Sequence, residues 1–262
     1  MNFEFKKSLG QNFLKDVNVI HKIVDSADID KNTLVIEVGP GQGAISRLIV
    51  DRAKFTILYE IDPSLKWFLN NMLKGSTDYK LIINDFLEED VKKELLNYDY
   101  DKLYMVANLP YYITTPIVTK LIDEEILPDK IVIMIQKEVA SRFAASINSK
   151  DYGALTVFLN YYYKIHKLFD VSRNCFFPKP NVDSTVVCME LKNDRLFVKD
   201  MEFFKRLVKD CFKYKRKNLR NNLIGYDLDK VCKVLGKYGL NLNDRAEALS
   251  LEIFVEIANE LV

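Results

Sequence analysis

The sequence of 262 residues is poor in the residues that build disulfide frameworks, metal centres and membrane spans. Its four cysteines are far apart and form no C-x-x-C pair, and its two histidines stand alone, so neither a zinc knuckle nor a redox dithiol is indicated. No apolar run approaches the roughly 18 residues of a membrane span, and residues 1–13 carry no apolar stretch of signal-peptide length. We therefore expect free thiols, no metal site, no membrane insertion and a cytoplasmic protein.

An excess of charge of one sign is also missing. Lys and Arg number 38 against 37 Asp and Glu, so the formal net charge is +1, and 48% of the residues are hydrophobic. Disordered chains combine low hydrophobicity with high net charge, so this composition excludes them. It excludes a uniformly basic coat but not a local basic patch. The length predicts one large domain, or one large and one small domain.

Five short apolar runs alternate with helix-length segments in the first half of the chain. They are residues 33–38, 55–60, 80–83, 103–107 and 131–135. Continuous apolar runs of this length are typical of parallel strands that are buried on both faces. We therefore predict an α/β fold with a doubly wound, Rossmann-like sheet.

The pattern changes after Gly153. Residues 154–163 and 184–191 look like two strands, and we expect them to form an antiparallel hairpin at one edge of the sheet. From Met201 onward, apolar residues recur with a helical period, which predicts a small all-helical C-terminal domain. The expected domains are residues 1–192 and residues 193–262.

A glycine loop follows the first predicted strand, in the segment Glu37–Gly43. Glycines at a strand–helix turn let the backbone approach a ligand closely, although a plain tight turn is the simpler alternative. The second strand ends in Glu60, which can accept hydrogen bonds from both hydroxyls of a ribose. The third strand is followed by Asp85, which can accept a hydrogen bond from an adenine amino group.

The fourth predicted strand ends in Asn108-Leu109-Pro110-Tyr111. The Asn108 side-chain oxygen and the Leu109 carbonyl can accept the two N–H bonds of an exocyclic aromatic amine, which draws its nitrogen toward tetrahedral geometry. Pro110 fixes the backbone, and Tyr111 can stack on the base. The alternative is an ordinary turn with a packed tyrosine pair.

Together these motifs resemble those of S-adenosylmethionine-dependent adenine-N6 methyltransferases. The opening Lys7–Leu14 narrows the resemblance to the ribosomal RNA adenine dimethyltransferases, in which this segment closes over the cofactor. That family has a housekeeping branch that dimethylates two adjacent adenosines near the 3′ end of small-subunit rRNA, and a resistance branch that methylates one adenosine of large-subunit rRNA. Four segments resemble the housekeeping branch: residues 108–111, 176–184, 216–223 and 245–250.

The resemblance implies a methyltransferase fold, S-adenosylmethionine as cofactor, and dimethylation of N6 of two adjacent adenosines in a hairpin of 16S rRNA, linked to subunit maturation. The implied cofactor-binding residues are Asn12, Leu14, Gly39, Gly41, Glu60, Ile61, Asp85, Phe86 and Asn108. The implied catalytic residues are Asn108, Leu109, Pro110, Tyr111 and Phe176. Phe176 is the expected second aromatic ring against the target base, but the sequence leaves open whether Phe176 or Phe177 faces it.

Positive charge gathers in the C-terminal part of the chain. Residues 191–262 contain 15 Lys and Arg and 11 Asp and Glu, a net of +4, which leaves −3 for the rest. We expect an RNA-binding surface here, although a solvated helix face is the simpler interpretation. Its candidate residues are Lys213, Lys215, Arg216, Lys217, Arg220 and Asn221.

The expected partner is small-subunit rRNA in an immature ribosomal subunit, bound by a monomer. Two other hypotheses stay open from the sequence. One is a ribosome-assembly factor in which methylation is secondary to binding. The other is a nicotinamide-dependent oxidoreductase, against which the G-x-G-x-G spacing and the segment 108–111 both argue.

Overall fold

The computed structural model describes residue 6 and residues 10–262, and the chain divides into two compact units. One unit comprises the described residues up to Ala140 together with His166–Leu191. The other comprises Ser141–Ile165 and Lys192–Val262. The division near residue 192 is where the sequence predicts a domain boundary, but residues 141–165, which we expected in the first domain, group with the C-terminal residues.

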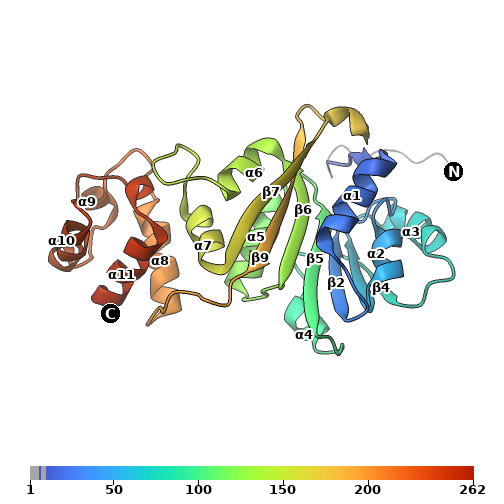
Figure 1. The fold of residues 1–262 in the computed structure, drawn as a ribbon, viewed down its shortest axis with the longest axis horizontal. Helices are drawn as coiled ribbons and strands as arrows, with labels where there is room; N and C mark the ends of the chain where they lie inside the picture. Colours follow the sequence, from blue (N-terminus) through green and yellow to red (C-terminus); the bar gives the residue numbers. More distant parts are fainter. Residues whose placement is uncertain (1–5, 7–9) are drawn as a thin grey trace. The chain divides into compact units, whose positions relative to one another are not determined.

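A seven-stranded sheet forms the centre of the first unit, in the order β4-β3-β2-β5-β6-β9-β7 (Figure 1). Its parallel strands are β2 (Thr33–Val38), β3 (Phe55–Glu60), β4 (Tyr79–Ile83), β5 (Lys102–Asn108) and β6 (Lys130–Gln136). These confirm all five strands predicted from the apolar runs. Strand β9 (Ser184–Leu191) pairs antiparallel with β6, and β7 (Tyr163–Val171) lies beyond it at the edge.

The sheet carries helices on its faces because its central strands are apolar on both sides. All six side chains of β2 are buried, as are the middle five of β5 and of β6. Val35, Val106 and Val132 pack with α1 and α2 in one core cluster. The helices that follow or precede the strands are α1 (Val17–Ala27), α2 (Ser46–Arg52), α3 (Lys66–Met72), α4 (Val91–Leu95), α5 (Thr114–Asp123) and α6 (Lys137–Phe143), with a 3₁₀ turn η2 (Pro63–Leu65) before α3.

The strand predicted over residues 154–163 is wrong, because Ala154–Tyr162 forms helix α7. Six of its nine side chains are buried, so the segment lacks the polar face that gives an amphipathic helix its period. A short apolar run of this kind does not distinguish a buried helix from a buried strand. The edge strand β7 begins only at Tyr163, where the helix ends.

The order of the strands reverses at β2, since β3 and β4 lie on one side of it and β5 and β6 on the other. Parallel strands on the two sides of such a point send their connections to opposite faces, which leaves a crevice at their carboxyl ends. The ends of β2, β3, β4 and β5 therefore meet at one edge of the sheet. This is where the sequence places the glycine loop, Glu60, Asp85 and Asn108.

A small ribbon lies beside this edge. Strand β1 (Phe13–Leu14) pairs antiparallel with β8 (Phe176–Phe177), so that Phe13 lies opposite Phe177 and Leu14 lies opposite Phe176. The Lys15 N–H continues the pairing by donating to the Cys175 carbonyl at 2.8 Å, in the 3₁₀ turn η3 (Arg173–Cys175). The ribbon brings the N-terminal segment and the segment with two prolines together.

The C-terminal residues of the second unit form helices, as predicted. Its elements after β9 are α8 (Met201–Cys211), α9 (Leu219–Asn222), α10 (Leu228–Lys237), the 3₁₀ turn η4 (Ala246–Ala248) and α11 (Leu251–Leu261). Residues 141–165 belong to this unit because the aromatic side chains of α7 pack on α8. The Phe204 ring lies 6.2 Å from the ring of Phe158 and 5.5 Å from that of Tyr161, between centroids.

An exposed basic loop (residues 212–218) connects α8 to α9. The side chain of Asn222, which is 8% exposed, reaches back into this loop. Its Oδ1 accepts from the Tyr214 N–H at 3.0 Å, and its Nδ2 donates to the carbonyls of Tyr214 and Lys217 at 3.3 and 3.4 Å. One buried amide therefore fixes the path of the loop.

Helix length and the grouping of metal-ligating side chains bear on membrane and metal binding in the described part of the chain. None of its helices is both long enough and apolar enough to cross a membrane. Within the same residues, no group of three or more His, Cys, Asp or Glu side chains is placed to hold a metal ion. All four cysteines are free thiols.

Candidate active site

A cavity opens at the carboxyl edge of the parallel strands, as the reversal at β2 predicts. Every cofactor-binding and catalytic residue expected from the sequence lies in its wall: Asn12, Leu14, Gly39, Gly41, Glu60, Ile61, Asp85, Phe86, Asn108, Leu109, Pro110, Tyr111 and Phe176. The structure thus brings together residues from separate segments of the chain, and their individual roles stay predictions. Lys7, Ser8 and Leu9 of the opening motif lie outside the described residues.

The glycine loop needs its glycines for a close approach by the N-terminal segment. Gly41 has a φ of 62°, in the left-handed region, and a Cβ at this position would lie 2.9 Å from Cε1 of Phe13. Any other residue at position 41 would displace the Phe13 ring. The loop and the N-terminal segment therefore form one continuous part of the cavity wall.

Glu60, at the end of β3, is 4% exposed and holds this loop in place. Its Oε2 accepts from the Gly41 N–H and its Oε1 from the Asp62 N–H, both at 2.9 Å. Burial raises the pKa of Glu60 above its ordinary value, although the two backbone donors oppose the shift. Each carboxylate oxygen keeps a second lone pair for a ligand hydroxyl.

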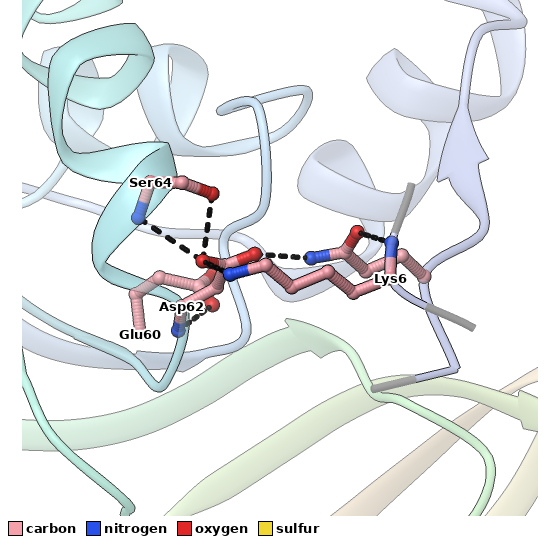
Figure 2. Close-up of polar contacts among 5 residues, drawn as sticks. Lys6, Glu60, Asp62 and Ser64 are labelled. Atoms are coloured by element: carbon pink, nitrogen blue, oxygen red, sulfur yellow. Dashed lines mark hydrogen bonds and ion pairs between the residues drawn. The ribbon is translucent and has the colours of Figure 1, made fainter. Parts of the chain in front are cut away.

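Asp62, which the sequence analysis leaves without a role, fastens the N-terminal segment to this site (Figure 2). Its buried carboxylate accepts from Lys6 Nζ at 2.6 Å and from Gln11 Nε2 at 2.7 Å, as well as from the backbone and hydroxyl of Ser64 at 3.0 and 2.7 Å. Burial alone would raise the pKa of Asp62, but the hydrogen bonds from Lys6, Ser64 and Gln11 outweigh it and lower the pKa to about 2. The carboxylate therefore stays charged at neutral pH and holds its donors.

A second buried acid, Glu37, faces the cavity from β2. It is 1% exposed, and its Oε2 has no hydrogen-bond partner in the part of the chain that the structure describes. Burial raises the pKa of Glu37 to about 8, and the neighbouring charge of Glu60 acts in the same direction. A buried carboxyl oxygen without a hydrogen-bond donor costs free energy. A ligand in the cavity that donates to this oxygen would remove the cost.

Asp85 and Phe86 follow β4. The Asp85 carboxylate accepts from the Leu87 N–H at 2.9 Å, which turns the chain and leaves its second oxygen for a ligand. Phe86 is buried and meets the Tyr59 ring edge-on at 5.1 Å between centroids. Both side chains are therefore fixed where they line the cavity.

The Asn108–Tyr111 segment combines free acceptors with a fixed aromatic ring. Among the described residues, none donates to the Asn108 side chain or to the Leu109 carbonyl, and both residues line the cavity. The Pro110 carbonyl accepts from the Ile113 N–H at 3.2 Å, which closes the turn. The Tyr111 hydroxyl hydrogen-bonds Ser184 Oγ at 2.7 Å, and Ser184 is completely buried at the start of β9.

The structure separates the two neighbouring phenylalanines of β8. Phe176 is 5% exposed and lines the cavity, whereas Phe177 is 49% exposed and lies outside its lining. Side chains alternate along a strand, so the two rings point to opposite sides of the ribbon. Of the two candidates left open by the sequence, Phe176 is the one placed in the wall.

The candidate RNA-binding residues lie in the second unit, on the basic loop and α9. Lys213, Lys215, Arg216, Lys217, Arg220 and Asn221 are all exposed. Arg216, Lys217 and Arg220 form no ion pair with the residues that the structure describes. Three cations on one short segment are thus available for an anionic ligand.

Gln11, Glu37, Asp62 and Ser184 are the residues of this site that the sequence analysis missed. Glu37 and Asp62 stand inside motifs that it recognised, so their position gave a signal but their contacts did not. Gln11 and Ser184 also stand inside recognised motifs, but their contacts could not be predicted because their partners lie 51 and 73 residues away in the chain.

We expect Asp62→Asn to release the N-terminal segment. The amide loses the charge that attracts Lys6, and it cannot accept from all of the present donors. Hydrogen exchange of the amides of residues 10–15 should become roughly tenfold faster or more, since a charge-assisted bond is removed. The control is Asp99→Asn, a carboxylate whose side chain is fully exposed. Equal exchange in both variants would contradict a fastening role for Asp62.

We expect Glu37→Gln to stabilise the protein above about pH 5. The folded-state pKa of Glu37 is about 8 and its ordinary value is 4.5, so its contribution to stability is complete below pH 4.5 and is lost as the pH rises through 8. Glutamine does not titrate, and the melting temperature of the variant should exceed that of the wild type by a margin that grows between pH 5 and pH 8. The exposed Glu88→Gln is the control. A margin independent of pH would show that burial does not perturb Glu37.

Comparison with known proteins extends this picture over the whole chain. A model of the family described as ribosomal RNA adenine dimethylase matches residues 2–262. A ribosomal RNA small subunit methyltransferase A from Staphylococcus haemolyticus is 41% identical over 98% of this chain and 90% of its own length, and one from Mycoplasma mobile is 40% identical over the full length of both.

A crystal structure of a dimethyladenosine transferase from Plasmodium falciparum superimposes with a TM-score of 0.78 at 25% identity, covering 94% of this chain and 95% of that one. A crystal structure of the 23S rRNA methyltransferase ErmE gives a TM-score of 0.72 at 26% identity, covering 95% and 99%. The chain therefore belongs to the ribosomal RNA adenine dimethylase family.

Proposed function

We propose that this protein dimethylates N6 of two adjacent adenosines in a hairpin near the 3′ end of small-subunit rRNA. The family's reaction is the dimethylation of rRNA adenine, with S-adenosylmethionine as the methyl donor. Two relatives at 40–41% identity over nearly the whole chain carry the small subunit in their names, which supports a small-subunit substrate. The fold alone does not decide between substrates, because a 23S rRNA methyltransferase is also structurally similar.

The observation that carries this proposal is the pair of free acceptors at Asn108 and Leu109. An exocyclic adenine amine is a weak nucleophile, because its lone pair is delocalised into the ring. Two acceptors at fixed positions bind its two N–H groups and favour a nitrogen whose lone pair points away from the ring plane. After the first transfer one N–H remains, and one acceptor still orients the amine for the second. Positioning then replaces a strong general base.

The cavity wall fits S-adenosylmethionine in two respects. The cofactor carries positive charge on its ammonium and sulfonium groups, and the orphaned Glu37 oxygen is a buried acceptor that such a group completes. The carboxylates of Glu60 and Asp85 line the same cavity and offer acceptors to hydroxyl and amino groups. Glu60 would hold the ribose hydroxyls and Asp85 the adenine amino group, with Asn12, Leu14, Ile61 and Phe86 around them. When bound, the cofactor supplies an activated methyl group.

Tyr111 and Phe176 are the proposed clamp for the target base. Phe176 is held by burial and by its pairing with Leu14, and Tyr111 by its hydrogen bond to Ser184. RNA bases in a helix reach such a cavity only by extrusion, which costs a few kcal/mol. Stacking recovers about 1–3 kcal/mol per base, so two fixed rings offset much of that cost.

The basic loop and α9 are the proposed RNA-binding surface. Lys213, Lys215, Arg216, Lys217, Arg220 and Asn221 are exposed, and the loop that carries most of them is held in shape by Asn222. Arg216, Lys217 and Arg220 form no ion pair with the residues that the structure describes, so they can bind phosphates without first breaking one. We also propose that the substrate is the immature small subunit, that the protein binds it as a monomer, and that the reaction takes place in the cytoplasm.

The reaction itself is tested with labelled S-adenosylmethionine and either unmethylated small subunits or large-subunit rRNA, followed by mapping of the labelled adenosines. We expect label on two adjacent adenosines of the small subunit. Asn108→Ala should lower the transfer rate by about 10²-fold or more while cofactor affinity, measured by calorimetry, largely survives. Asn71→Ala, on the exposed surface of α3, is the matched control. Label only in large-subunit rRNA would refute the proposed substrate.

The RNA-binding surface is tested by the salt dependence of binding. We expect the double variant Arg216→Gln, Lys217→Gln to bind small-subunit rRNA more weakly. The slope of log affinity against log salt should be smaller by about 0.7–0.9 for each phosphate that the variant no longer binds. Lys230→Gln, an exposed cation on α10, is the control for a change of charge elsewhere. An unchanged slope in the double variant would remove the loop from the interface.

A further inference from the structure

Phe177 is an exposed aromatic side chain at the border of the proposed active site. It follows Phe176 directly in β8, yet 49% of its surface is exposed where Phe176 is 5% exposed. Its partner across the ribbon is Phe13, whose ring lies against the position of the Gly41 Cβ in the cavity wall. Residues opposite each other in an antiparallel pair point to the same side, so Phe177 points to the same side of the ribbon as Phe13, which lines the cavity.

A cation is held next to this ring by the same ribbon. The backbone of Lys15 is tied to the Cys175 carbonyl, and the Lys15 ammonium lies 4.2 Å from the centre of the Phe177 ring. Lys15, which follows β1 directly, and Lys179, which follows β8 by two residues, are both exposed. A half-exposed ring with a neighbouring ammonium presents two groups that bind a nucleotide: a face for stacking and a partner for a phosphate.

We propose that Phe177 and Lys15 bind the nucleotide that adjoins the adenosine in the cavity. The Phe177 ring stacks on its base, and the Lys15 ammonium contacts a phosphate of the strand that leads into the cavity. This site rests on the proposed function, since it matters for an enzyme that must modify two neighbouring adenosines. Phe176 then faces the adenosine under reaction, and Phe177 holds the adjoining nucleotide outside the cavity.

The ribbon gives this arrangement a physical basis. Successive residues of a strand lie about 3.3 Å apart and point to opposite sides, so two adjacent side chains can hold two bases that have been separated from each other. Extrusion of the target adenosine breaks its stack with the neighbouring base. The Phe177 ring replaces that broken stack and holds the RNA strand in register for the transfer to the second adenosine.

The test compares Phe177→Ala and Phe177→Trp on unmethylated small subunits. We expect Phe177→Ala to raise the KM for the subunit roughly tenfold, as loss of one stacked base predicts, and to make the two adjacent adenosines unequal in methylation. Phe177→Trp should restore both values, and the dissociation constant of S-adenosylmethionine should stay unchanged in both variants. Trp67→Ala, a similarly exposed ring on α3, is the control. Wild-type KM and wild-type methylation of both adenosines in Phe177→Ala would overturn the proposal.

A second readout separates this site from the proposed reaction. A single-stranded RNA with 2-aminopurine next to an adenosine loses fluorescence when that base stacks on an aromatic ring. We expect quenching by the wild type and by Phe177→Trp, and at least a roughly tenfold higher protein concentration for the same quenching by Phe177→Ala or Lys15→Gln. If quenching depends on Phe177 but the protein does not methylate small subunits, the proposed function is refuted and the stacking site is not. Equal quenching by the wild type and Phe177→Ala would refute the stacking site.

Discussion

The buried carboxylate of Glu60 connects the parts of this enzyme that have to act together. Its two oxygens accept from the backbone of Gly41 and of Asp62, so one side chain fixes the glycine loop against the end of β3. Through Asp62 the same connection reaches Lys6 and Gln11 of the N-terminal segment (Figure 2). Burying a carboxylate is costly, which appears as a raised pKa, and the two backbone donors offset part of that cost.

The sequence predicts the sheet and the place of the site well, because both follow from burial. Strands β2 to β6 form the parallel part of the sheet, and in its covered centre only residues such as Val35, Val106 and Val132 are compatible with their positions. Once the strands are parallel, their carboxyl ends meet at one edge, and the polar residues that end them must converge. Glu60, Asp85 and Asn108 lie together for this reason, although they are far apart in the sequence.

Two kinds of feature were beyond prediction from the sequence. Helix α7 is buried on nearly every side, so it carries neither the helical nor the strand period, and its membership of the second unit depends on the packing of Phe158 and Tyr161 on Phe204. The contacts of Asp62 with Gln11 and of Tyr111 with Ser184 join residues that are distant in the chain. A carboxylate or hydroxyl in a motif shows that a polar group is present, but only the folded chain shows which group it meets.

In the basic loop between α8 and α9, the path of the backbone and the positive charge depend on different groups. Its path is fixed by neutral hydrogen bonds between the Asn222 amide and the backbone of Tyr214 and Lys217, whereas its positive charge comes from exposed ammonium and guanidinium groups. Dissolved ions screen the charges and leave the buried amide bonds nearly unaffected. A change of ionic strength thus changes the electrostatic field of the loop without changing the path of its backbone. The RNA that we propose as ligand would then bind a surface that needs no renewed ordering of the chain.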